Sequence, residues 1–147
     1  MERGQQTPGG APSPIDAPCQ PRFVVDVMLG KLAKWLRVLG YDVVYSNRLT
    51  DEEILQRAEA EERIILTRDT RLIERRQAQR YLLIHSDHYS EQLRQVVRAL
   101  RLDTRRGLFT RCVRCNGELV SVPKAEVVHE VPFYTFRTQE CFARCLG

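Results

Sequence analysis

The sequence lacks long apolar runs: none approaches the roughly eighteen residues that a membrane-spanning helix needs. Its first residues also lack the apolar segment of a secretory signal. We therefore expect no membrane contact and a cytoplasmic location. The Gly30-Lys31 dipeptide has no upstream P-loop glycine, which argues against an NTPase of that class. The sequence contains no internal repeat either.

Composition divides the chain into three parts. Residues 1–21 are rich in proline, glycine and glutamine, cannot bury enough apolar surface to fold, and are expected to form a disordered tail. With 147 residues and 43% hydrophobic residues, the whole chain suits one domain with a small appendage. We expect the domain at residues 22–106 and the appendage at residues 107–147.

The positive charge is concentrated in one part of the chain. Residues 22–111 contain eighteen Lys and Arg against thirteen Asp and Glu, a net charge of +5. Residues 1–21 carry a net charge of −1, and residues 112–147 are balanced. Such a block is typical of proteins that bind polyanions, although an ordinary basic surface explains it equally well.

Apolar periodicity predicts four strand–helix pairs. Strands are expected at residues 22–27, 41–46, 63–67 and 81–86, and helices at residues 28–40, 49–62, 69–79 and 89–102. Thr50 and Glu53 have the spacing of a capping box, and Gly40 suits the end of a helix. This alternation predicts an α/β fold whose mainly parallel sheet has helices on both faces.

An aspartate lies at or just after the end of each predicted strand. These residues are Asp26, Asp51, Asp69 and Asp87. The carboxyl ends of parallel strands share one edge of a sheet, so we expect the four side chains to lie together. Crowded carboxylates repel one another unless a cation neutralises them, and Mg²⁺ or Mn²⁺ prefers such oxygen ligands. The pattern favours a metal site of Asp26, Asp51 and Asp69, with Asp87 a fourth candidate catalytic residue.

Each aspartate also has a structural interpretation. Asp51 and Asp69, taken singly, suit helix N-caps, and Asp87 suits a turn. Asp26 is the exception because it interrupts an apolar run, where a purely structural carboxylate needs a buried partner.

Basic residues flank the predicted acidic edge. The candidates for holding nucleic-acid phosphates are Lys31, Lys34, Arg37 and Arg68. The first three recur at every third position of one predicted helix, so a solvated helix face is the alternative. Trp35, the one tryptophan, is expected in the core and not as a platform for bases.

Four of the five cysteines form two close pairs near the C-terminus. They are Cys112 and Cys115, in a C-x2-C pattern, and Cys141 and Cys145, in a C-x3-C pattern. Paired cysteines without an export signal favour metal binding over disulfides. Four thiolates suit a closed tetrahedral zinc site with a structural role, and His129 is a spare candidate ligand.

Five segments carry a resemblance to a known family: "FVVDVMLGKLAKWLRVLGYDVVY", "TDEEIL", "RIILTRDTRL", "SEQLRQVV" and "RCVRCNGEL". Together they make the chain, over about residues 22–145, similar to the Mut-seven C-terminal ribonuclease family, a PIN-like domain followed by a zinc ribbon. The resemblance implies a PIN-like fold and metal-dependent cleavage of RNA. It matches Asp26, Asp51 and Asp69 to the family's acidic residues, Asp87 to a possible fourth, and the four cysteines to its ribbon.

The combined hypothesis is a Mg²⁺- or Mn²⁺-dependent ribonuclease with RNA as its partner and zinc as a structural cofactor. A non-catalytic RNA-binding module, whose carboxylates are helix caps, is the main alternative. A protein-interaction adaptor that uses the ribbon is the third.

Overall fold

The computed structural model describes residues 20–147, and its first part is built on a four-stranded parallel sheet. The strands are β1 (Phe23–Val25), β2 (Val43–Val44), β3 (Ile64–Thr67) and β4 (Tyr81–Leu83), in the order β2-β1-β3-β4. The predicted α/β fold with a mainly parallel sheet is therefore confirmed. The tail predicted at residues 1–21 lies, except for its last two residues, outside the described part.

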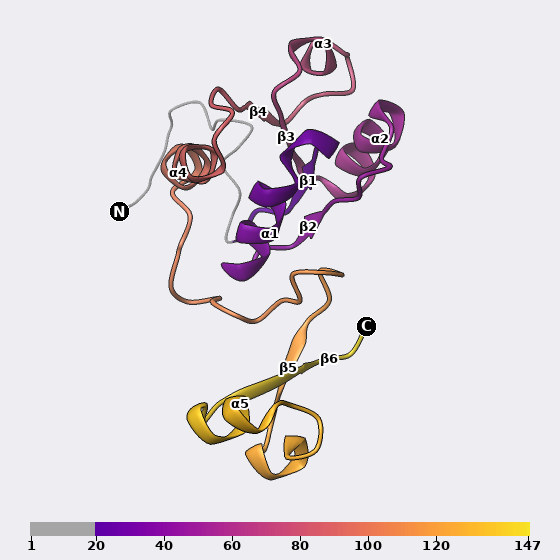
Figure 1. The fold of residues 1–147 in the computed structure, drawn as a ribbon. Helices are drawn as coiled ribbons and strands as arrows, with labels where there is room; N and C mark the ends of the chain where they lie inside the picture. The colour runs from indigo at the N-terminus through magenta and orange to yellow at the C-terminus, as the bar shows by residue number, and fades with distance from the viewer. Residues whose placement is uncertain (1–19) are drawn as a thin grey trace, which may run out of the picture.

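Helices cover both faces of this sheet (Figure 1). They are η2 (Val27–Leu29), α1 (Gly30–Val38), α2 (Asp51–Glu61), α3 (Thr70–Ile73) and α4 (Tyr89–Leu100). Alternate residues of β1 point to opposite faces: Phe23 and Val25 pack with α1 and α4, and Val24 packs with α2 and α3. None of the helices in residues 20–147 is long and apolar enough to cross a membrane.

Local sequence signals explain most helix ends. The Thr50 hydroxyl and the Glu53 carboxylate form the predicted capping box at the start of α2. Gly40, with φ of 97°, follows α1 in the left-handed region that glycine tolerates. The helix predicted at residues 69–79 is wrong in length, since α3 ends at Ile73. The residues that follow α3, at 74–77, are all polar and give it no apolar face to bury.

The C-terminal part is a small antiparallel hairpin with short helices. Strands β5 (Leu119–Val122) and β6 (Phe142–Cys145) pair with Leu119 opposite Cys145 and Val122 opposite Phe142. Between them lie η3 (Lys124–Val127) and α5 (Phe133–Thr138). Figure 1 shows this hairpin below the parallel sheet, joined to α4 by a long connecting segment.

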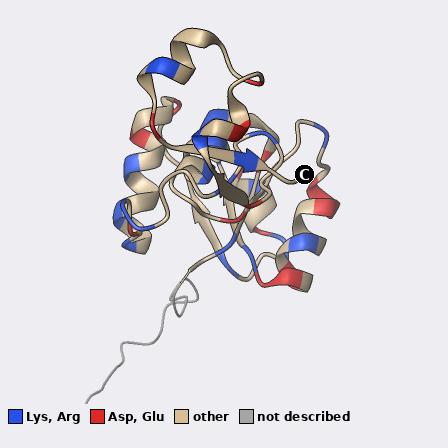
Figure 2. Cartoon of the chain, turned by 90° about the horizontal axis from the view of Figure 1, so that it is seen from below, with Lys and Arg blue, Asp and Glu red and all other residues tan. Residues whose placement is uncertain are grey.

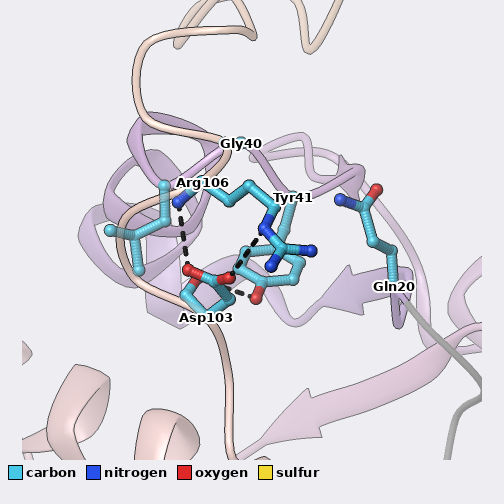
Figure 3. Close-up of a pocket in the computed structure, with 7 residues that line it drawn as sticks. Gln20, Gly40, Tyr41, Asp103 and Arg106 are labelled. Atoms are coloured by element: carbon cyan, nitrogen blue, oxygen red, sulfur yellow. Dashed lines mark hydrogen bonds and ion pairs between the residues drawn. The ribbon is translucent and has the colours of Figure 1, made fainter.

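The segment of residues 101–118, which connects α4 to β5, is anchored near the amino ends of the strands of the parallel sheet. The Asp103 carboxylate accepts hydrogen bonds from the backbone N–H groups of Arg105 and Arg106, at 2.8 and 3.0 Å. The Tyr41 hydroxyl donates to the Asp103 carbonyl at 2.9 Å. These groups line a shallow pocket with Gln20 (Figure 3). Since Gln20 precedes β1 and Tyr41 precedes β2, this pocket lies at the sheet edge opposite the predicted acidic site.

A buried guanidinium ties three elements of the sheet domain together. Arg63 donates to the Phe23 carbonyl at 3.0 Å and to the Asp42 carboxylate at 2.9 Å, and it pairs with Glu61. Burial raises the pKa of Asp42, but hydrogen bonds from Arg63 and Asn116 and the nearby positive charges outweigh it, so the pKa lies below its ordinary value.

Replacing Arg63 with methionine should destabilise the fold by about 3–5 kcal/mol, because it leaves buried acceptors without their donor. The control Arg57→Met removes an exposed guanidinium that also pairs with Glu61, and should cost less than about 1 kcal/mol. Asp42, with its lowered pKa, adds stability above its unfolded pKa and loses it as the pH falls through the folded value. The difference between parent and Arg63→Met should therefore narrow in acid. Urea unfolding measures both effects, and equal losses in the two variants would contradict the assignment.

Candidate functional site

Asp26 is a buried carboxylate at the carboxyl end of β1, with only 5% of its surface exposed. One carboxylate oxygen accepts a hydrogen bond from the Val27 N–H at 2.7 Å, which caps η2. The other accepts from the Thr67 hydroxyl, also at 2.7 Å. The partner that a buried carboxylate requires is thus the last residue of the neighbouring strand β3, and it is neutral.

Thr67 links Asp26 to Asp69. Its hydroxyl oxygen accepts a hydrogen bond from the Asp69 N–H at 2.9 Å, while its O–H group donates a hydrogen bond to Asp26. Asp69 caps α3 by accepting from the Arg71 N–H at 2.8 Å. From β1 the chain continues to β2 on one side, and β3 is added on the other side of β1. Asp26 and Asp69 follow β1 and β3, so they lie at the switch point where open α/β sheets bind their ligands.

Asp51 completes a group of three carboxylates. It is exposed, and it is the first residue of α2. Its pKa lies above the ordinary value because of partial burial and, next, because of the negative charges of Asp26 and Asp69. The negative charges of Asp26 and Asp69 therefore act on Asp51, as expected if the three acids lie at the same edge of the sheet.

The donor set of these three residues fits a hard divalent cation. All the donors are carboxylate oxygens, and each oxygen of Asp26 keeps a lone pair beyond its single hydrogen bond. The three residues do not bring one oxygen each within 4.8 Å of one another, a limit that a cysteine group does meet. With Mg–O bonds of about 2.1 Å, ligands of one ion lie at most about 4.2 Å apart, so at this spacing at least one of the three carboxylates would reach a shared Mg²⁺ ion through a bound water.

The remaining predicted catalytic residue, Asp87, lies exposed in the turn between β4 and α4. Asp87 is not among the negative charges that raise the pKa of Asp51, which belong to Asp26, Asp69 and Glu52. The role of Asp87 therefore stays a prediction. Arg68 lies nearer to the site: it is exposed, precedes Asp69, and donates to the His85 carbonyl at 3.3 Å.

The predicted phosphate-binding residues separate into exposed and buried ones. Lys and Arg occur on helices on both sides of the molecule, so charge alone marks no single surface (Figure 2). Lys31 and Lys34 are exposed on α1 and line a groove together with Tyr45 and Arg114. Arg37 also borders this groove but is only 5% exposed.

Arg37 uses its guanidinium within the protein. Nε and Nη2 donate to the Val43 carbonyl at 3.1 and 2.9 Å, and Nη1 donates to the Val113 carbonyl at 2.9 Å. Burial lowers the pKa of Arg37, and the charges of Cys115 and Cys112 partly offset this. The structure thus gives Arg37 a role in joining the two parts of the chain. Its predicted contact with RNA stays untested.

Three cysteines near the C-terminus form a compact group. The Sγ atoms of Cys112, Cys115 and Cys145 all lie within 4.8 Å of one another, with Cys115 and Cys145 at 3.4 Å. Tetrahedral zinc with Zn–S bonds of about 2.3 Å needs sulfurs about 3.8 Å apart. The three residues therefore could bind a metal ion such as zinc.

Cys141 lies outside this group, contrary to the predicted set of four. Cys145 is brought beside the first pair because it pairs with Leu119, at the end of β5 next to the C-x2-C turn. Four residues of extended chain span about 13 Å, so Cys141 lies toward the far end of the hairpin. In this arrangement Cys141 is not beside the other three sulfurs, and its role as a fourth ligand stays a prediction. His129 is exposed and is not in the group either.

The sulfurs differ in acidity. The backbone N–H groups of Cys115 and Arg114 lower the pKa of Cys112 to about 7. The Gly147 N–H lowers the pKa of Cys145, but its neighbours Cys115 and Cys112 outweigh this, so that pKa is raised. Of these two thiols, Cys112 is therefore the more readily ionised. A divalent cation is bound by the thiolate forms of cysteine, so its binding releases protons.

The model of the Mut7-C RNAse domain matches residues 21–147, which is most of the chain. The chain belongs to the Mut7-C RNAse domain family. A comparison with curated proteins found no match. Family membership supports a nuclease-type hydrolase acting on RNA. The matched residues include both the acidic edge and the cysteine group.

In this Mut7-C domain, the segment of residues 112–116, called here the cysteine knuckle, packs against the edge strand β2. The Asn116 side chain accepts from the Val43 N–H at 2.9 Å and donates to the Asp42 carboxylate at 2.7 Å. Asn116 has φ of 71°, a conformation that asparagine tolerates better than most residues. The cysteine knuckle is thus fastened directly to the sheet that carries Asp26.

Sequence reasoning missed three residues of the site. Thr67 closes the strand expected at residues 63–67, and a hydroxyl at the end of a buried apolar run is itself a signal for a buried acceptor nearby. The cysteine spacing points to metal binding and gives no signal for Arg114 or Asn116, which lie between and beside Cys112 and Cys115. Their roles depend on contacts between distant segments that spacing does not reveal.

Proposed function

We propose that the protein is a Mg²⁺- or Mn²⁺-dependent ribonuclease in which Asp26, Asp51 and Asp69 hold the metal. The observation that carries the proposal is the Thr67 hydroxyl, which fixes Asp26 and positions Asp69 at the same point between β1 and β3. A pair of simple helix caps does not require a shared buried hydroxyl. Membership of the Mut7-C RNAse family supports the same function.

The residues of the chain have separate tasks in this proposal. When bound, a divalent cation supplies Lewis acidity at the scissile phosphate and activates a water for attack at phosphorus. Asp26 is held rigidly by its two hydrogen bonds, whereas Asp51 is exposed and free to adjust. Lys31, Lys34 and Arg68 offer exposed positive charge and would bind the phosphates on either side of the cut.

We further propose that the C-terminal part binds a structural zinc ion through Cys112, Cys115 and Cys145. Support comes from the sulfur geometry and from the knuckle's attachment to β2 through Asn116. In this view the metal stiffens the turn that closes one wall of the basic groove, where Arg114 faces Lys31 and Lys34. The domain division at residue 106/107 and a cytoplasmic location remain part of the same proposal.

One observation favours the alternative of a non-catalytic RNA-binding module. Asp26 and Asp69 both accept backbone hydrogen bonds as N-caps, which is a structural function in itself. In that case the basic groove would bind RNA and the acids would only shape the edge of the sheet.

Cleavage of a labelled single-stranded RNA by the purified protein separates the two functions. We expect cutting when Mn²⁺ or Mg²⁺ is added and none when both are left out, while RNA binding persists without them; leaving the ions out keeps the zinc that a chelator would remove. Binding that remains without cleavage under every metal condition would favour the binding module. Cleavage that continues unchanged when both ions are left out would contradict a metal-dependent site.

A further inference from the structure

Two aromatic side chains lie parallel on the surface between α1 and α4. Trp35, predicted to lie in the core, is 44% exposed, and Tyr89 is 37% exposed. Their ring centroids are 6.4 Å apart and their planes differ by only 4°. The apolar residues Leu32 and Leu36 bury the other side of α1, so Trp35 is not needed to fill that core. The core prediction for Trp35 is therefore wrong.

This aromatic surface extends to the acidic edge and carries positive charge. His88 stacks on Tyr89 with centroids 5.2 Å apart, and Lys31 Nζ lies 5.3 Å from the centre of the Tyr89 ring. Tyr89 begins α4, directly after the turn that follows β4, and so lies at the same end of the sheet as Asp26. Met28, two residues after Asp26 in η2, is 58% exposed and adds an apolar side chain between Asp26 and α1.

We propose that Trp35, Tyr89 and His88 form a stacking platform for the bases of single-stranded RNA next to the acidic site. The inference rests on the proposed function and names its substrate class. Parallel, exposed aromatic rings with a nearby ammonium group match an unpaired base attached to an anionic backbone. In duplex RNA the faces of the bases are already stacked on one another, so the platform selects single strands.

The arrangement also gives the path of the RNA. Lys31 contacts the platform through Tyr89 and lines the basic groove through its place on α1. A strand whose bases lie on Trp35 and Tyr89 therefore has its phosphates beside Lys31. The next nucleotides then reach the edge that carries Asp26 and Asp69.

Trp35 reports on this contact directly because it is the only tryptophan in the chain. The full-length protein is titrated without added Mg²⁺ or Mn²⁺, so that its zinc is kept, with an oligouridylate of about ten nucleotides, while a label on the RNA reports binding through anisotropy. We expect tryptophan quenching that follows the anisotropy. An abasic ribose-phosphate strand of equal length should bind without comparable quenching, and duplex RNA should also leave the tryptophan signal unchanged.

Variants give the second arm of the test. Tyr89→Ala should weaken binding of the oligouridylate about tenfold, whereas Tyr89→Phe, which keeps the ring, should bind like the parent. Tyr134→Ala removes an exposed aromatic side chain from α5 and should have no effect. In cleavage assays Tyr89→Ala should raise KM and leave kcat nearly unchanged.

Specific results would overturn the platform. RNA binding without tryptophan quenching, equal quenching by the abasic strand, or full affinity of Tyr89→Ala would each do so. If the platform fails while metal-dependent cleavage persists, the proposed function stands without it. If quenching and base-dependent binding occur without cleavage, the platform stands and the nuclease proposal fails.

Discussion

Asp26→Asn is expected to lower RNA cleavage by on the order of a hundred- to a thousandfold. The substitution keeps the shape of the side chain but removes the charge of the one fully fixed carboxylate of the site. It also disturbs the local hydrogen bonds, because an amide has only one acceptor oxygen for both Val27 N–H and the Thr67 hydroxyl. RNA affinity without added Mg²⁺ or Mn²⁺ should be unchanged or higher, since one negative charge near the phosphates is lost.

The matched control is Asp103→Asn, which neutralises an exposed carboxylate at the opposite edge of the sheet. It should cut RNA like the parent. Cleavage rates with Mn²⁺ and binding constants without added Mg²⁺ or Mn²⁺, measured for all three proteins, separate chemistry from binding. Full activity in Asp26→Asn would assign the observed cleavage to a contaminant or to residues other than this site.

Cys115→Ser is expected to abolish metal binding by the C-terminal part, whereas Cys141→Ser should bind like the parent. The first variant removes a sulfur from the group that lies within 4.8 Å, and the second removes an exposed thiol outside it. Structural zinc contributes about 10–16 kcal/mol in small zinc modules, so loss of one ligand should unfold the cysteine knuckle. Metal content of the purified variants and cobalt absorption spectra measure the difference.

The pair of serine variants also tests the number of ligands. Equal loss of metal in Cys141→Ser would show that the hairpin rearranges to bring a fourth sulfur to the ion, contrary to the described pairing of β5 and β6. Hydrogen exchange provides a further readout. Cys115→Ser should lose protection at the Val43 amide, because the Asn116 side chain that accepts its hydrogen bond belongs to the same turn.

The sequence was sufficient for the sheet and for the positions of its acids. Strands such as Ile64–Thr67 are apolar because both faces of a parallel sheet are covered, and the capping box fixes the start of α2. The carboxyl ends of parallel strands share an edge, so spacing alone indicated that Asp26 and Asp69 approach each other. These conclusions depend on local periodicity and on topology, which a single sequence contains.

Other features depend on contacts between distant segments and were not predictable in this way. Arg37 has the spacing of an exposed basic residue but is buried because the cysteine knuckle covers it. Trp35 is exposed although a large aromatic side chain favours the core, because Leu32 and Leu36 already fill the core-facing side of α1. For Cys141, the sequence gives a close pair but not the strand geometry that separates the two sulfurs.

Strand β2 ends the parallel sheet, and both outward-facing backbone groups of its first residue are occupied by side chains. The Val43 N–H donates to Asn116, and the Val43 carbonyl accepts from Arg37. An open edge strand is a template for pairing with strands of other chains, and such pairing leads to aggregation. The cysteine knuckle therefore acts as a cover for that edge. Metal loss that frees the knuckle should expose β2 and make the protein prone to self-association, even while its acidic site stays intact.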